Sequence, residues 1–107
     1  MEFTPEQKNE YLDKLVTKTQ EGMVMTEISL LKYREKLAQK KALLDIIDTK
    51  LANKEYESAR DGKNEKKQVE SDILNYEHEI KEHLQSIQDG IDDLELIERY
   101  RQAQVSE

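Results

Sequence analysis

The apolar residues of this chain are arranged symmetrically about Gly62, and this symmetry constrains the fold more than any other feature of the sequence. The apolar pairs at equal distance from Gly62, whose residue numbers add to 124, are Leu51 and Ile73, Leu44 and Ile80, Leu37 and Ile87, and Leu30 and Leu94. Two helices that run in opposite directions from a shared turn would bring such pairs into common layers. The sequence therefore predicts an antiparallel helical hairpin with its turn at residues 61–64.

The spacing of these residues is that of a coiled coil. Apolar residues that alternate at intervals of three and four form a seam, the narrow strip along which two helices pack. We expect helices over about 27–60 and about 65–102. Their predicted seam and interaction residues are Leu30, Tyr33, Leu37, Leu44, Ile47, Leu51, Ile73, Tyr76, Ile80, Leu84, Ile87, Ile91, Leu94 and Ile97. Lys40 and Lys54 also fall at seam positions, where long aliphatic stems can reach past the seam to water.

A shorter helix is predicted before the hairpin, over about residues 5–20. Thr4 and Gln7 have the spacing of a capping box, and Pro5 suits the first helical position because its missing N–H needs no partner. Gly22 favours a break or bend after this helix.

The break is expected at residues 21–26, because Thr26 can cap a new helix. One unbroken helix over about 5–60 would keep the same seven-residue register, since an interior glycine costs only about 1 kcal/mol. Residues 103–107 are expected to form a tail, and the whole chain, 1–107, is predicted to be a single helical domain.

The composition restricts the class of protein. Charged residues make up 38% of the chain and apolar residues only 36%, which is enough for a seam between helices but not for a broad core. There is no cysteine, no apolar run near the roughly 20 residues that a membrane span needs, and no signal-peptide pattern. We expect a cytoplasmic or other intracellular protein that makes no membrane contact, and virion association is one alternative. The net charge of −7 disfavours direct binding to nucleic acid.

No pattern of catalytic or metal-binding residues is present. His78 and His83 are five residues apart, whereas the zinc-protease motif needs two histidines four apart on one helix face. His78 with Glu82 and Glu79 with His83 have the spacing of ordinary i,i+4 surface pairs. We therefore predict no catalytic residue, no metal, no cofactor and no enzymatic activity.

The charges agree with the predicted pairing. Residues 26–47 carry five Lys or Arg and three acids, and residues 77–98, which would face them, carry eight acids and Lys81. The basic residues Lys32, Arg34, Lys36, Lys40 and Lys41 would thus lie beside Glu82, Asp89, Asp92 and Asp93. In this interpretation the acidic segment 89–98 complements the basic stretch. The alternative hypothesis is that it imitates nucleic-acid phosphates.

The predicted pairing leaves residues 1–20 without a partner inside the hairpin, and this points to docking on another protein or a second copy. The candidate partner-docking residues are Leu12, Leu15, Val16, Met23 and Met25. We expect a non-enzymatic coiled-coil structural or adaptor protein that acts through helix–helix contacts in a larger assembly or a homo-oligomer.

Two other functions fit the sequence. One is a small acidic inhibitor or nucleic-acid mimic, of viral origin, that blocks a basic site on a host protein. The other is a helical-hairpin chaperone or scaffold factor. The layout resembles that of small helical-hairpin assembly factors such as prefoldin subunits and tubulin cofactor A, and this likeness is one of architecture, which does not carry function.

Overall fold

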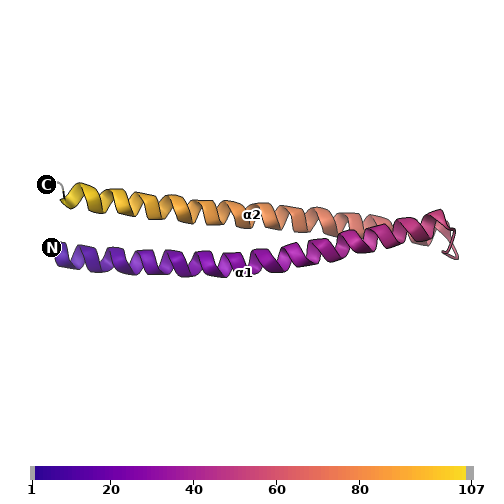
Figure 1. The fold of residues 1–107 in the computed structure, drawn as a ribbon, viewed down its shortest axis with the longest axis horizontal. Helices are drawn as coiled ribbons and strands as arrows, with labels where there is room; N and C mark the ends of the chain where they lie inside the picture. The colour runs from indigo at the N-terminus through magenta and orange to yellow at the C-terminus, as the bar shows by residue number, and fades with distance from the viewer. Residues whose placement is uncertain (1, 106–107) are drawn as a thin grey trace. The chain divides into compact units, whose positions relative to one another are not determined.

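A computed structural model describes residues 2–105, and the regular elements in this range are two long α-helices. α1 spans Pro5–Ala52 and α2 spans Ala59–Val105, with a loop at residues 53–58 between them (Figure 1). The all-α helical hairpin predicted from the sequence is confirmed.

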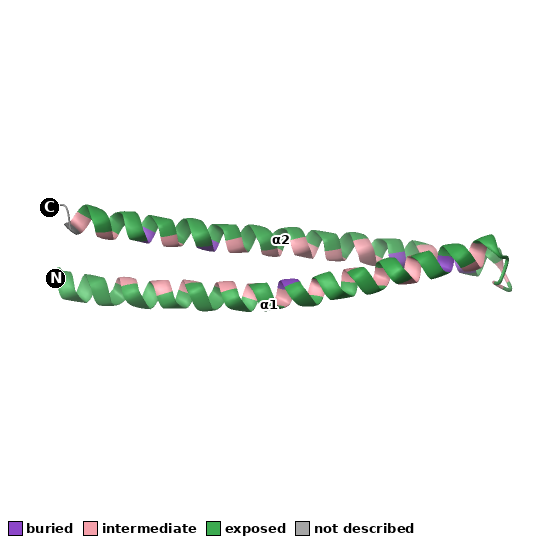
Figure 2. Cartoon of the chain, in the orientation of Figure 1, coloured by how far each residue is buried: buried purple, intermediate pink, exposed green. Residues whose placement is uncertain are grey.

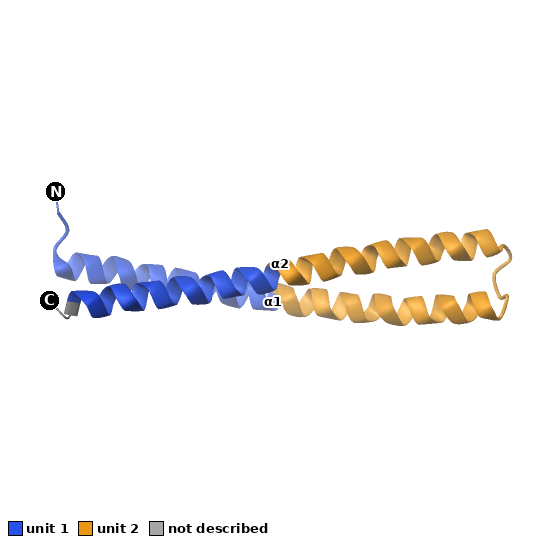
Figure 3. Ribbon diagram, turned by 90° about the horizontal axis from the view of Figure 1, so that it is seen from above, with its two compact units in different colours: residues 1–28, 83–107 blue, residues 29–82 orange. Residues whose placement is uncertain are grey.

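The chain divides into two compact units, each built from a segment of both helices (Figure 3). Unit 1 comprises Met1–Ile28 and His83–Glu107, and unit 2 comprises Ser29–Glu82. Within each unit the segment of α1 lies beside the segment of α2 and runs in the opposite direction. The single domain expected from the sequence stays a prediction.

α1 is one continuous helix, so the predicted break at residues 21–26 and the separate helix over 5–20 are wrong. Its start is as predicted: the Thr4 N–H donates to Gln7 Oε1 (3.0 Å) and the Gln7 N–H donates to Thr4 Oγ1 (3.2 Å). Thr26 does not cap a new helix, because its hydroxyl donates to the Gly22 carbonyl inside α1 (2.9 Å). The seven-residue register continues through Gly22, so continued seam packing outweighs the weak helix propensity of glycine.

The turn lies at residues 53–58, and the predicted turn at 61–64 is wrong. α1 ends in a Schellman motif, in which the Glu55 N–H donates to the Lys50 carbonyl (2.9 Å) and the Lys54 N–H to the Leu51 carbonyl (3.2 Å). Lys54 has a φ of 56° and takes the left-handed position that glycine usually fills. Lys54 is therefore a loop residue and not the seam residue expected from its spacing.

Gly62 belongs to the first turns of α2 and is buried there. A Cβ on Gly62 would lie 2.6 Å from Leu51 Cδ2 and 2.7 Å from Tyr56 Cδ2. The missing side chain thus makes room for two large ones. Glycine at this position serves close packing, and its conformational freedom is not used.

The contacts of two glycines define the true pairing of the helices. Leu51 faces Gly62 in unit 2 and Met23 faces Gly90 in unit 1, so the numbers of paired residues add to 113 and not to 124. The difference between these sums is close to three helical turns, about 11 residues. A shift of this size leaves the apolar face of each helix unchanged and alters every pair.

The correct pairing restores a regular heptad on α2. Its inward positions alternate at four and three residues without interruption: Gly62, Lys66, Val69, Ile73, Tyr76, Ile80, His83, Ile87, Gly90, Leu94, Ile97 and Arg101. His83 and Gly90 take the places that the sequence analysis gave to Leu84 and Ile91, which are 45% and 38% exposed. The prediction of Leu84 and Ile91 as seam residues is therefore wrong.

The apolar core is thin. Of the apolar side chains in the described residues, those that are buried are Leu30, Ile47, Val69 and Ile97 (Figure 2). The predicted seam residues that are half-buried are Tyr33, Leu37, Leu44, Leu51, Ile73, Tyr76, Ile80, Ile87 and Leu94. Lys40 is half-buried at a seam position, as expected.

Lys54→Gly should stabilise the hairpin. Glycine adopts a positive φ without the steric cost of a Cβ, so the free energy of unfolding should rise by about 1 kcal/mol. The measurement is urea unfolding followed by circular dichroism. The control is Lys41→Gly, at an exposed position inside α1, which should lower the free energy of unfolding by about 1 kcal/mol. If both glycines destabilised equally, the left-handed assignment of Lys54 would be wrong.

Gly22→Ala and Gly90→Ala should change stability in opposite directions. Nothing lies within 4 Å of a Cβ on Gly22, so the better helix propensity of alanine should add about 1 kcal/mol of stability. A Cβ on Gly90 would lie 2.7 Å from Met23 Cγ, and the overpacking should remove about 1 kcal/mol despite the gain in propensity. Thermal unfolding of both variants compares the two effects, and equal stabilisation would contradict the observed pairing.

Candidate interaction surface

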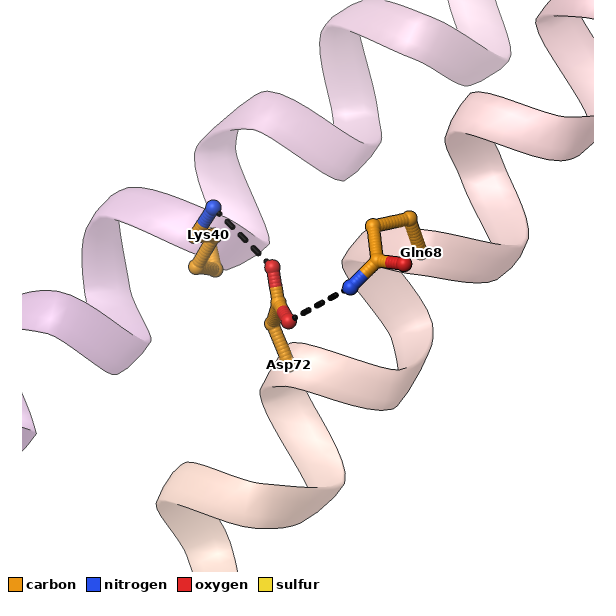
Figure 4. A network of polar contacts seen from close by, with 3 residues as sticks. All are labelled: Lys40, Gln68 and Asp72. Atoms are coloured by element: carbon orange, nitrogen blue, oxygen red, sulfur yellow. Dashed lines mark hydrogen bonds and ion pairs between the residues drawn. The ribbon is translucent and has the colours of Figure 1, made fainter.

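Two ion pairs join the helices of unit 2. Lys40 Nζ lies 3.1 Å from Asp72 Oδ2, and Gln68 Nε2 donates to Asp72 Oδ1 at 3.0 Å (Figure 4). Lys66 Nζ lies 2.8 Å from Asp48 Oδ1. The hydrogen bond from Lys40 has the largest effect on the pKa of Asp72 and lowers it, and the hydrogen bond from Gln68 lowers it further. The hydrogen bond to Asp48 raises the pKa of Lys66. Exposed pairs of this kind contribute at most about 1 kcal/mol, so they select the pairing of the helices more than they stabilise it.

A tyrosine organises the loop end of unit 2. The Tyr56 hydroxyl donates to Glu65 Oε2 (3.0 Å), and Lys50 Nζ lies 4.5 Å from the centre of the Tyr56 ring. The pKa of Tyr56 is raised, first by loss of hydration and then by the hydrogen bond to Glu65 and the charge of Glu65. These contacts hold the ring against Gly62 and close the loop.

The predicted pairing of the basic stretch with the acidic segment is wrong. Lys40 pairs with Asp72 within unit 2, and the acidic segment 89–98 lies in unit 1. The shift of the pairing by three turns separates the two charged segments. Among the described residues no ion pair involves Lys32, Arg34 or Lys41, and none involves Asp92, Asp93 or Glu95. Apart from Lys40, the residues of the basic stretch and the acidic residues of segment 89–98 are therefore exposed.

The N-terminal segment is paired inside the chain, so the prediction that residues 1–20 lack a partner is wrong. Asp13 forms an ion pair with Arg101 of α2. The reason is the position of the turn: because the loop precedes Ala59, the last turns of α2 reach the beginning of α1 in unit 1.

The five candidate docking residues fall into two groups. Leu12, Val16 and Met23 are half-buried at seam positions of unit 1. Leu15 and Met25 are 47% and 65% exposed and remain available for docking. Docking through these residues stays a prediction.

Unit 1 contains an open apolar groove that the sequence analysis missed. Its volume is about 650 Å³, and it is lined by Phe3, Lys8, Tyr11, Leu12, Leu96, Ile97 and Tyr100. The rings of Phe3 and Tyr11 meet edge to face with centroids 5.1 Å apart. One signal was available in the sequence: Leu96 and Tyr100 are four residues apart, on one helix face and off the seam.

A hollow with acidic walls adjoins this groove. It has a volume of about 360 Å³ and is lined by Asp92, Asp93, Glu95, Leu96 and Arg99. Leu96 belongs to both sites and is 65% exposed. Apolar surface therefore passes into acidic surface within one turn of α2.

The histidines form no metal centre in the described residues. His78 Nε2 lies 3.4 Å from Glu82 Oε1, which is the predicted i,i+4 surface pair. Within residues 2–105 no three His, Asp or Glu side chains come close enough together to hold a metal ion. Over the same range, neither helix has an apolar stretch long enough to cross a membrane.

Comparison with known proteins adds no relative. No family model, no curated protein and no solved structure matches the chain. The fold and surface define an all-α helical hairpin with a thin seam, an exposed apolar groove and two separate charged segments.

The Tyr56 hydroxyl should lose its proton above the ordinary tyrosine pKa of about 10. The protonated form is favoured in the folded state, so its contribution to stability is present below pH 10 and is lost as the pH rises through the folded pKa. Spectrophotometric titration of tyrosinate, compared with Tyr56→Phe, isolates this group. Glu65→Gln should lower the pKa, and an unchanged curve in Glu65→Gln would contradict the contact.

Proposed function

We propose that the protein is a non-enzymatic structural or adaptor component that acts through helix–helix contacts in a larger assembly or a homo-oligomer. The observation that supports this most directly is the imbalance of apolar burial. Four apolar side chains are buried in the described residues, whereas thirteen large apolar or aromatic side chains are exposed. A chain with this imbalance gains most from packing against further helices.

The exposed apolar side chains support the same proposal. Every 100 Å² of apolar surface removed from water contributes about 2.5 kcal/mol before the costs of association. Covering part of the exposed apolar surface would therefore stabilise helices whose own seam covers each apolar side chain on one side only. We place this action in the cytoplasm or elsewhere inside the cell.

A second candidate function is a small acidic inhibitor that blocks a basic site on another protein. The observation in its favour is the exposed acidic segment of unit 1, in which Asp92, Asp93 and Glu95 have no ion pair among the described residues. Binding of this kind would weaken as salt rises and would be lost when these three carboxylates are neutralised.

The proposed function is tested by the size of the protein in its native source. We expect the tagged chain to sediment as part of a species larger than 12.6 kDa. Leu96→Ser with Tyr100→Ser removes exposed apolar surface and should reduce that size without changing the circular dichroism. Leu44→Asp, which places a charge in the seam, should lose helicity and serves as the unfolding control. A monomer at native concentration would overturn the proposal.

A further inference from the structure

We propose that unit 1 binds a basic amphipathic helix of another protein in a groove that runs along one side of its seam. This assignment rests on the proposed function and adds to it the chemistry of the partner. The shape of the groove favours a helix, its exposed side chains require an apolar face on that helix, and its charge requires lysine or arginine beside that face.

Three hollows of unit 1 join into one long groove. The apolar groove and the acidic hollow share Leu96, and the acidic hollow shares Asp93 with a third hollow of about 400 Å³. Met23 and Gly90, which meet in the seam, belong to the lining of this third hollow. From Ser86 to Tyr100 the lining residues of α2 extend over about 21 Å, or about four helical turns.

The long groove lies between two stripes of residues beside the seam. On each helix these residues alternate at intervals of three and four, as residues on one helix face do. Those of α1 are Lys8, Tyr11, Leu15, Lys18 and Gly22. Those of α2 are Ser86, Asp89, Asp93, Leu96 and Tyr100. A groove between two packed helices is the place where a third helix can lay its apolar face.

Exposed apolar side chains line the long groove. Tyr11, Leu96 and Tyr100 are 51%, 65% and 48% exposed, and Leu15 is 47% exposed. Nothing lies within 4 Å of a Cβ on Gly22, so the groove also has open space beside α1. A helix that covers these side chains would need apolar residues at intervals of three and four on one face.

The net charge of the chain is concentrated in unit 1. Residues 1–28 carry six acids and three lysines, and residues 83–107 carry six acids and two arginines, which gives the whole charge of −7. Unit 2 carries twelve acids and twelve Lys or Arg, so it has no net charge. A partner that recognises unit 1 by charge is therefore basic.

The acids of the long groove lie on its α2 side. Asp89, Asp92, Asp93 and Glu95 line it there together with Arg99. Asp89 and Asp92 accept hydrogen bonds from the neutral side chains of the glutamines four residues before them, at 2.9 and 3.0 Å, and these bonds leave the negative charge in place. Two lysines line the α1 side. The cations of the partner helix would thus face α2.

A second copy of the chain does not offer such a helix. Its unit 1 repeats the negative charge, and its unit 2 has no net charge. Both of its long helices are also packed in their own seams. The charge and the packing together therefore favour a helix of another protein as the occupant.

The test uses a model peptide as the probe. It has about 18 residues, all Leu or Lys, with the leucines at intervals of three and four so that they form one helix face. One control peptide has the same composition in an order without an apolar face, and the other has Glu in place of every Lys. Fluorescence anisotropy with the full chain should show that the probe binds about tenfold more tightly than either control peptide. Its affinity should fall as salt rises.

Two variants of the chain locate the binding site. Leu96→Ser with Tyr100→Ser removes apolar surface from the long groove, and Asp89→Asn with Asp93→Asn removes charge from it. Each variant should raise the Kd of the probe about tenfold. The second variant should also weaken the dependence of the Kd on salt. Circular dichroism checks that both variants keep their helices.

Matched controls make the same kinds of change at exposed positions of unit 2. Leu31→Ser with Leu74→Ser removes apolar side chains that are 65% and 67% exposed. Glu35→Gln with Glu77→Gln removes two exposed charges. Both controls should bind the probe like the natural chain.

A further pair of variants fills the open space of the groove. Gly22→Gln places a long polar side chain where nothing lies within 4 Å of a Cβ, so the helix should be kept and the Kd should rise about fivefold. Gly22→Ala adds one methyl group and should change the Kd by less than about twofold.

The inference is overturned if the probe does not bind, if the control peptides bind equally well, or if the unit 2 controls weaken binding as much as the groove variants. A purified chain that dimerises, and whose dimer is dissociated by Leu96→Ser with Tyr100→Ser, would place a second copy in the groove and overturn the basic helix as occupant.

Failure of the inference can be told apart from failure of the proposed function. A chain that does not bind the probe, yet sediments in a larger species from its native source, would overturn the inference alone. A chain that binds the probe in the long groove, yet sediments as a monomer from its native source, would overturn the proposed function alone.

Discussion

The structure depends on two places where a helix has no side chain. Leu51 and Tyr56 pack against Gly62, and Met23 packs against Gly90. A Cβ on either glycine would lie too close to these side chains. These contacts fix which turn of α2 lies against which turn of α1 in each unit. A coiled-coil seam alone does not fix this, because a shift by one heptad plus four residues still places seam residues against seam residues. Polar pairs such as Lys40 with Asp72 then reinforce the same choice.

The pairing of the helices also decides which charges are neutralised. If the pair numbers added to 124, the acidic segment of α2 would meet the basic stretch of α1 and neither would be free. In the observed pairing the basic stretch lies in unit 2 and the acidic segment in unit 1. Apart from Lys40, which pairs with Asp72, the fold thus leaves the charged residues of both segments exposed.

Local patterns predicted the fold class well and the loop poorly. The capping box of Thr4 and Gln7 and the alternation of three and four residues are local properties, and both are present in the structure. The turn was misplaced because glycine is common at helix ends, whereas here Lys54 takes the left-handed position. The groove lined by Phe3, Tyr11 and Tyr100 depends on the pairing of the start of α1 with the end of α2, which local patterns do not predict.

The sequence by itself determined that the chain is all-α, that two long helices fold back on each other, and which side of each carries the seam. These follow from the 3.5-residue periodicity that the seam residues of both helices share. Only the tertiary structure decided the pairing, since pair sums of 113 and 124 differ by about three turns and present the same faces. The choice between them depends on the volume of individual side chains. The observed pairing places Met23 against Gly90 and Leu51 against Gly62, where the glycines leave room for the larger side chains.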